Sequence, residues 1–210
     1  MSNNIKSPVI RPMVYVDVES VVNLHVRAFP GFFLSFLGPS FLREFYRSFT
    51  RDSNGVAFVA VEDANNQIIG VIAGPVVPDG YFRRLLVQRW WAFCLASFWA
   101  VLRNPRIIPR LWRAVFYRGE PPAGMPRALL SSIAVLPDAQ NRGVGQLLVK
   151  AWVDEVRKRG ATGCYLTTDA ENNDAINRFY EKAGWNRSET FVTPEGRKMY
   201  RYLLDFWNQG

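Results

Sequence analysis

A buried strand, a glycine-bearing loop and an amphipathic helix follow one another between residues 128 and 160. Residues 128–135 are an apolar run of the length that suits a buried strand. The loop Gln140 to Gly145 (QNRGVG) comes next, and the apolar side chains of residues 144–156 then recur with the helical period of 3.6. Gly160 is a typical stop for that helix. The chain is therefore predicted to combine a sheet with helices that pack on it.

The loop itself predicts an anion site. The first N–H groups of a helix have no partner within the helix, and glycines allow a ligand to approach the backbone closely. The loop lacks the Gly-Lys-Ser/Thr ending of a Walker motif and the leading glycine of a dinucleotide-binding fingerprint. Taken alone, it is equally compatible with an ordinary glycine-bearing entry into a helix.

The rest of the pattern predicts a mixed α/β domain that occupies residues 1–210. Asp17 and Ser40 are candidate N-caps of two helices near the start of the chain. Further strands are predicted at 9–16, 55–62, 68–77, 164–168, 185–192 and 198–204, and helices at 17–28, from Ser40 onward and at 173–183.

Composition narrows the class further. With 49% hydrophobic and 21% charged residues, the 210-residue chain has the apolar content of a globular protein. Its only cysteines are Cys94 and Cys164, and its first residues are polar, so we expect a cytoplasmic protein without a disulfide framework. No residue pattern suggests a metal site.

Residues 81–118 carry the excess of positive charge. This segment has eight arginines and no lysine or acidic residue, which matches the net charge of +8 of the whole chain. The uncharged run 90–102 is shorter than the roughly 20 residues that span a bilayer. Residues 106–117 place arginines on one helical face and apolar side chains on another.

We interpret residues 80–125 as an amphipathic helical insertion between the third and fourth strands. It is expected to lie on an anionic membrane surface at the inner leaflet. A lid or a homodimer contact is the alternative. Nucleic acid is the least favoured partner, because the uncharged run is more apolar than such binding requires.

Two motifs and their spacing resemble the GNAT superfamily of acyl-CoA-dependent N-acetyltransferases. The family's pyrophosphate loop, Gln/Arg-x-x-Gly-x-Gly/Ala, is matched by Gln140, Gly143 and Gly145 directly after a strand. About thirty residues later the family has a helix with an early Asn and a Tyr followed by Gly-aromatic, matched by Asn173, Tyr180 and Gly184-Trp185. The resemblance covers residues 127–205 well and 9–79 loosely. It implies the GNAT-like acyl-CoA N-acyltransferase fold.

The resemblance also implies roles for residues. The strand before the loop would splay from its neighbour and bind the pantetheine arm of acetyl-CoA, the acyl donor, and the loop would hold the pyrophosphate. Tyr180 would protonate the leaving thiolate, which suits a phenol with a pKa near 10. The residues assigned to acetyl-CoA are Ile133, Ala134, Val135, Gln140, Asn141, Arg142, Gly143, Val144, Gly145 and Asn173.

The general base has no candidate of the same quality. Many relatives place a carboxylate on the strand before the loop, but residues 127–135 contain none. Asp169 and Glu171 are the nearest acids and are expected in a solvated loop. His25, the only histidine, is expected to be structural rather than catalytic.

These patterns favour transfer of an acetyl group to a primary amine. A membrane-proximal amino sugar or a lipid-linked precursor is the expected acceptor, since such a substrate and the insertion would share the bilayer surface. A soluble small amine, peptide or protein is an alternative acceptor. A non-catalytic CoA-binding adaptor of a membrane or partner is the alternative from another class.

Overall fold

The computed structural model describes residues 7–30, 38–63, 65–85, 87, 127–194 and 196–206. The strands there are β1 (Val9–Pro12), β2 (Gly55–Glu62), β3 (Gln67–Pro75), β4 (Arg127–Leu129), β5 (Ser132–Val135), β6 (Gly163–Asp169), β7 (Asn186–Val192) and β8 (Lys198–Asp205). The helices are α1 (Val18–Ala28), α3 (Pro39–Arg51), α6 (Val144–Lys158) and α7 (Asp174–Lys182). The mixed α/β class predicted from the sequence is confirmed.

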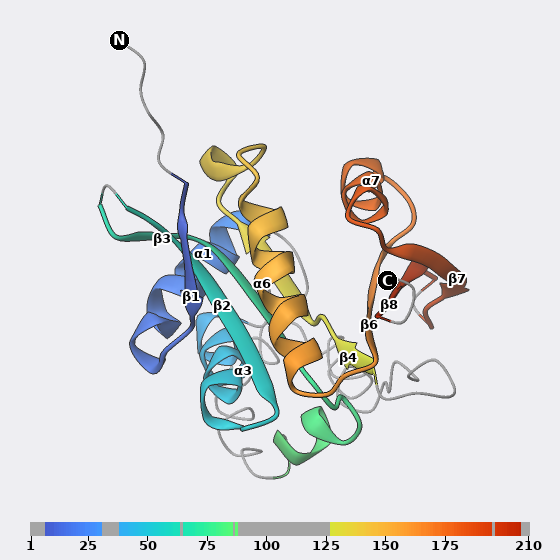
Figure 1. Ribbon diagram of the computed structural model, residues 1–210, viewed down its shortest axis with the longest axis horizontal. Coiled ribbons are helices and arrows are strands. Elements are labelled where there is room, and N and C mark those ends of the chain that lie inside the picture. Colours follow the sequence, from blue (N-terminus) through green and yellow to red (C-terminus); the bar gives the residue numbers. More distant parts are fainter. Residues whose placement is uncertain are drawn as a thin grey trace.

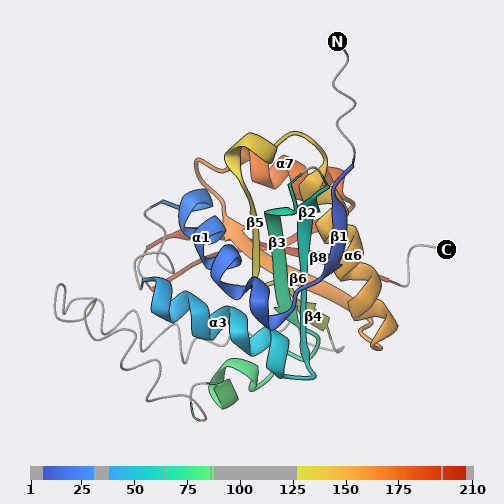
Figure 2. The same ribbon diagram turned by 90° about the vertical axis from the view of Figure 1, so that its left-hand side faces the viewer.

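The strands form two sheets (Figure 1). The consecutive strands β4 and β5 belong to different sheets. The first sheet has the order β1-β2-β3-β5 and is antiparallel throughout. The second has the order β4-β6-β8-β7, in which only β4 and β6 run parallel. Helices α1 and α3 lie on one side of the first sheet and α6 on the other (Figure 2). Because apolar side chains of the sheet face both helical layers, its central strands are buried on both faces.

The apolar run 128–135 is where the two sheets meet. The sequence predicts one strand there, and that prediction is wrong, because the run divides into β4 and β5. The backbone N–H of Leu130 still bonds to the carbonyl oxygen of Tyr165 in the second sheet, at 3.0 Å. The next N–H, that of Ser131, bonds to the carbonyl oxygen of Ala73 in the first sheet, also at 3.0 Å. The chain therefore changes sheets within two residues, and β5 separates from β6 as the family resemblance implies.

Gly74 allows this change of sheet. A Cβ atom at this position would lie 1.9 Å from the carbonyl oxygen of Leu129 and 3.0 Å from the ring of Trp152. A side chain would therefore force β3 and β4 apart, so the end of β3 has room only for glycine.

Two predictions near the start of the chain need correction. The first strand ends at Pro12 rather than at residue 16, because residues 15–17 form a 3-10 turn. Helix α3 begins at Pro39, with Gly38 rather than Ser40 at the N-cap. Asp17 does stand at the N-cap of α1, but its carboxylate accepts hydrogen bonds from the Arg11 guanidinium instead of capping the helix.

Most of the predicted insertion 80–125 lies outside the described residues, so its helices and its membrane-facing side stay predictions. Where the described chain enters it, residues 81–85 are helical, and the Tyr81 hydroxyl donates to Ser48 Oγ of α3 at 3.0 Å. No helix in the described ranges is long and apolar enough to cross a bilayer.

Candidate active site

The loop before α6 has the geometry of an anion site. Asn141 and Gly143 both have positive φ angles, of 59° and 77°, so the loop turns sharply as it enters the helix. The N–H of Leu147 is the first that bonds within the helix, to the carbonyl oxygen of Gly143. Within the part of the chain that the structure describes, the backbone N–H groups of residues 141–146 donate to no other residue. Such a run of free donors at a helix N-terminus attracts phosphate oxygens.

Helix α7 packs directly beside this loop. A Cβ atom at Gly145 would lie 3.4 Å from the ring of Phe179, so the second glycine lets the two helices approach. Tyr180, the predicted proton donor, follows Phe179 on α7. Figure 1 shows α7 next to the N-terminal half of α6.

Two side chains of the loop, those of Gln140 and Arg142, form hydrogen bonds within the protein. Arg142 donates from Nη2 to Glu62 Oε1 at 2.9 Å, and Gln140 donates from Nε2 to the carbonyl oxygen of Val135 at 3.3 Å. Glu62 is the last residue of β2, so the ion pair ties the loop to the first sheet. Both members of the pair are about one-quarter exposed, at 29% and 27%, so the Arg142 guanidinium is open to solvent on its remaining side.

Strand β5 offers an unpaired edge beside the loop. Its residues Ile133, Ala134 and Val135 pair with Ile72, Val71 and Gly70 of β3. No described strand pairs with the opposite edge of β5, which ends the first sheet. Apart from the Val135 carbonyl oxygen, which accepts from Gln140 Nε2, the backbone groups on that edge have no partner among the described residues and can bind an extended, amide-bearing ligand such as the pantetheine arm.

Tyr180 is 4% exposed and lies among aromatic rings. The rings of Trp185 and Tyr202 are each 5.8 Å away, centroid to centroid. Burial raises the pKa of the Tyr180 phenol above its ordinary value of 10, so the hydroxyl is protonated at neutral pH. Among the described residues, none forms a hydrogen bond with this hydroxyl. It is thus a proton-bearing group without a structural partner in that part of the chain.

Asn173 holds a corner of the fold. Its Nδ2 donates to Thr168 Oγ1 at 2.8 Å and to the carbonyl oxygen of Asp169 at 3.0 Å, which fixes the end of β6 to the start of α7. Asn177, one helical turn later, donates to the same carbonyl oxygen at 3.2 Å. Both amide hydrogens of Asn173 are therefore used within the chain, and its contact with acetyl-CoA stays a prediction.

The acids near the end of β6 are poor candidates for a general base. Asp169 accepts two-pronged hydrogen bonds from Arg197 of the β7–β8 hairpin, at 2.6 and 2.7 Å. Glu171 is exposed, as expected for a solvated loop. Within the described ranges there is also no group of histidine, cysteine and acidic side chains that could hold a metal ion.

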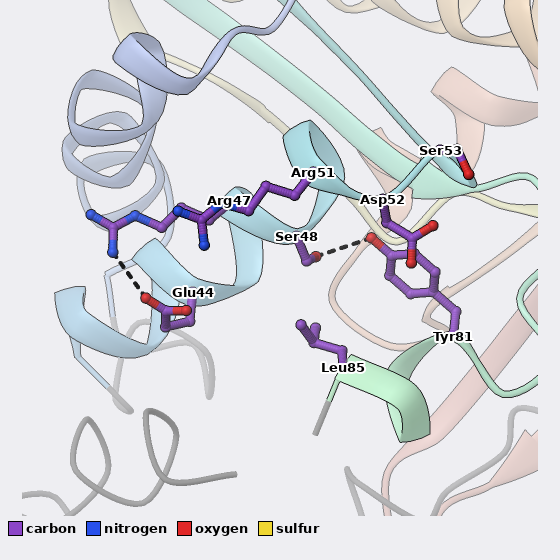
Figure 3. A pocket seen from close by; sticks show the side chains of 8 residues that line it. All are labelled: Glu44, Arg47, Ser48, Arg51, Asp52, Ser53, Tyr81 and Leu85. Atoms are coloured by element: carbon purple, nitrogen blue, oxygen red, sulfur yellow. Dashed lines mark hydrogen bonds and ion pairs between the residues drawn. The ribbon is translucent and has the colours of Figure 1, made fainter. Parts of the chain in front are cut away.

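A pocket of about 490 Å³ lies at the other end of the first sheet (Figure 3). It borders the start of β2, whereas the anion loop borders the end of β2. Its charges are mixed, and the Arg47 guanidinium pairs with Glu44 at 2.9 Å. Its lining residues are Glu44, Arg47, Ser48, Arg51, Asp52, Ser53, Tyr81 and Leu85. Because none of them lies on the loop, β5 or α7, this pocket is separate from the candidate active site.

An anion loop beside the open edge of a splayed strand defines an α/β protein that can bind a phosphate-bearing ligand with an extended amide arm. The model of the acetyltransferase (GNAT) family matches residues 18–185. The chain belongs to this family, and the resemblance seen in its two motifs is confirmed.

Relatives and solved structures agree with this assignment. The chain is 37% identical over 78 residues to the [ribosomal protein bS18]-alanine N-acetyltransferase of Escherichia coli, covering 35% of this chain and 52% of that protein. It is 29% identical over 126 residues to N-alpha-acetyltransferase 30 of Schizosaccharomyces pombe, covering 60% and 73%. The chain thus spans about half the length of the bS18 acetyltransferase. The fold is similar to that of Arabidopsis thaliana NAA60 in complex with acetyl-CoA, with a TM-score of 0.60, 17% identity, and 96% and 100% coverage.

Proposed function

We propose that this protein is an acetyl-CoA-dependent N-acetyltransferase that acts on a primary amine. The observation that carries the proposal is the free donor run of residues 141–146 at the end of the open edge of β5. A ligand with a pyrophosphate and an amide-bearing arm fits these two features together. The acetyl-CoA complex of the structurally similar NAA60 supports the same donor.

Tyr180 supplies a proton in the proposed reaction. The amine nitrogen forms a bond to the thioester carbonyl carbon, the carbon–sulfur bond breaks, and the amine releases one proton. The departing thiolate takes a proton from the Tyr180 hydroxyl, which then regains one from solvent. The sulfur atom is not basic while it is part of the thioester and gains basicity only as it leaves as a thiolate, whose thiol has a reference pKa of about 8.5, so the proton transfer accompanies bond breaking.

The test is the substitution Tyr180→Phe with Tyr202→Phe as its matched control. The Tyr202 ring lies against Tyr180, but its hydroxyl is already bonded to Asn177 and Glu181 of α7. We expect Tyr180→Phe to lower kcat by about 10²-fold or more while acetyl-CoA affinity stays unchanged. Equal effects of the two substitutions on kcat would remove Tyr180 from the donor role. No turnover with any amine, despite acetyl-CoA binding, would favour a non-catalytic CoA-binding adaptor.

The acceptor we propose is a membrane-proximal amino sugar or lipid-linked precursor, reached by an enzyme on the inner leaflet. The argument rests on the sequence of residues 106–117, where Arg106, Arg110 and Arg113 share one helical face. Co-sedimentation with anionic and neutral liposomes tests it, with the three arginines changed to glutamine as the comparison. Loss of binding to anionic vesicles in the triple variant is the expected result. Failure of the unchanged protein to bind them would leave the insertion as a lid or a homodimer contact.

A protein N-terminus is the second candidate acceptor. It is favoured by the relatives of the chain, which include an alanine N-acetyltransferase of ribosomal protein bS18 and N-alpha-acetyltransferase 30. A panel of amino sugars and short peptides, assayed with and without anionic vesicles, separates the two. Acetylation of peptides that is independent of vesicles would favour the second candidate.

A further inference from the structure

A buried chain of three polar side chains links both helices of one layer to strand β5. His25 of α1 lies with its Nδ1 atom 2.7 Å from the hydroxyl oxygen of Tyr46 on α3. That hydroxyl lies 3.0 Å from Ser132 Oγ at the start of β5. His25 is 3% exposed and Tyr46 is fully buried, whereas Ser132 is only partly buried. These hydrogen bonds thus connect the buried His25 to Ser132, which is partly exposed.

Ser132 occupies a defined place relative to the predicted acetyl-CoA site. The anion loop follows the carboxyl end of β5, so an arm that leaves the loop along this edge passes Val135, then Ala134 and then Ile133. The next residue on the strand is Ser132. At about 3.3 Å per residue, Ser132 lies roughly 10 Å from Val135 along the strand. Ser132 is therefore close to the point where the two sheets separate. The end of the arm, which carries the thioester, is expected at this separation.

The two hydrogen bonds that join His25, Tyr46 and Ser132 can run in one direction. Burial keeps the His25 imidazole neutral, so one ring nitrogen accepts a hydrogen bond and the other carries a hydrogen. If Nδ1 is the acceptor, the Tyr46 hydroxyl donates to it and accepts in turn from the Ser132 hydroxyl. Ser132 Oγ then uses its hydrogen toward Tyr46 and keeps its lone pairs available as acceptors. An acceptor amine presents N–H hydrogens, and such a lone pair is suited to receive one of them.

We propose that Ser132 is a catalytic residue that accepts a hydrogen bond from the acceptor amine and orients it toward the thioester carbonyl, with Tyr46 and His25 as positioning residues. The proposal rests on the proposed acetyltransferase function. In the proposal Ser132 orients the amine, in a segment whose residues 127–135 include no carboxylate. His25 takes no proton in it.

The test is a double-mutant cycle with Ser132→Ala and Tyr46→Phe. The protein provides matched controls, because the Tyr81 hydroxyl and Ser48 of the same helix α3 form another buried tyrosine–serine hydrogen bond of 3.0 Å, which does not involve β5. We expect Ser132→Ala and Tyr46→Phe each to lower kcat/KM for the amine about tenfold, with unchanged affinity for acetyl-CoA. The double variant should be no worse than Ser132→Ala, and Ser132→Thr should retain activity. Ser48→Ala and Tyr81→Phe should leave kcat/KM within about twofold.

A second measurement determines the direction of the hydrogen bonds between His25, Tyr46 and Ser132. His25 is the only histidine, so one pair of imidazole ¹⁵N resonances reports its tautomer without assignment. We expect hydrogen on Nε2, and a change in the Nδ1 resonance when an amine acceptor binds in the presence of CoA. Hydrogen on Nδ1, or full activity of Ser132→Ala, would overturn the proposal. If the unchanged protein fails to acetylate any amine, the proposed function itself fails, and that outcome is distinct because it appears before any variant is compared.

Discussion

Acidification should destabilise this fold through His25. Burial lowers the pKa of its imidazole from 6.5 to about 4. In the unfolded chain the imidazole titrates at its ordinary pKa, so between these two values the unfolded state binds a proton that the folded state does not. The free energy of unfolding therefore rises with pH across this window. The contribution of His25 is complete above pH 6.5 and is lost as the pH falls toward 4.

The size of the effect follows from the two pKa values. Each pKa unit corresponds to 1.36 kcal/mol, so the full contribution of His25 is about 3 kcal/mol. That is a large part of the roughly 5–15 kcal/mol by which most domains are stable. Urea unfolding at a series of pH values between about 4 and 7 measures it directly. We expect the free energy of unfolding to fall by about 3 kcal/mol more in the unchanged protein than in His25→Gln, which has no titrating group at this position.

Comparing the unchanged protein with His25→Gln separates the pH dependence of stability due to His25 from that due to the carboxylates. Burial alone would raise the pKa of Asp17, but hydrogen bonds from Arg11 and from the N–H of Val14 lower it below 3.8. Its stabilising effect is therefore lost only at the acid end of the range, and equally in both proteins. Parallel curves of unfolding free energy against pH for the unchanged protein and His25→Gln would refute the reasoning, because they would mean that folded and unfolded imidazoles titrate alike.

Three further variants test the loop and the junction of the sheets. Gly143→Ala meets no steric contact but must adopt a φ of +77°, so we expect acetyl-CoA affinity in calorimetry to fall about five- to thirtyfold, and unchanged affinity would remove the phosphate role of the loop. Glu62→Gln frees the Arg142 guanidinium, so acetyl-CoA should bind a few-fold more tightly at low salt, with the gain lost as salt is added; weaker binding would mean that Glu62 orients Arg142 for its ligand. Gly74→Ala places a Cβ against the carbonyl oxygen of Leu129, so thermal unfolding should show a loss of about 3 kcal/mol or more, and a neutral result would contradict the packing of β3 on β4.

The sequence was most informative where a local pattern and the tertiary structure agree. The glycine loop and the helix from Val144 were predictable, because anion loops, helical periodicity and a glycine stop are local features. The proton-donor role of Tyr180 comes from the family resemblance and its spacing from Gly184-Trp185, and it stays a prediction; the residue is buried, and no residue in the described ranges forms a hydrogen bond with its hydroxyl.

Other features depend on contacts between distant parts of the chain, and no local pattern reveals them. The break between β4 and β5 arises because Leu130 and Ser131 bond to two different sheets, and nothing in the mostly apolar run 128–135 marks it. Likewise, Ser132 and Tyr46 are 86 residues apart in sequence, and neither stands in a recognisable motif. The sequence suggested a structural role for His25, but only its contact with Tyr46 shows what it holds.

The break in the strand explains why stability and function are linked in this fold. If residues 127–135 continued along β6 as one strand, the edge of β5 would be paired, and no backbone groups would remain there for a ligand. The break leaves that edge open, and it requires both the glycine at position 74 and the hydrogen bonds of Leu130 and Ser131. Ser132 follows the break directly and is held from the opposite side by Tyr46. A substitution that weakens this junction should therefore impair acetyl-CoA binding and amine orientation together, even when it touches neither ligand.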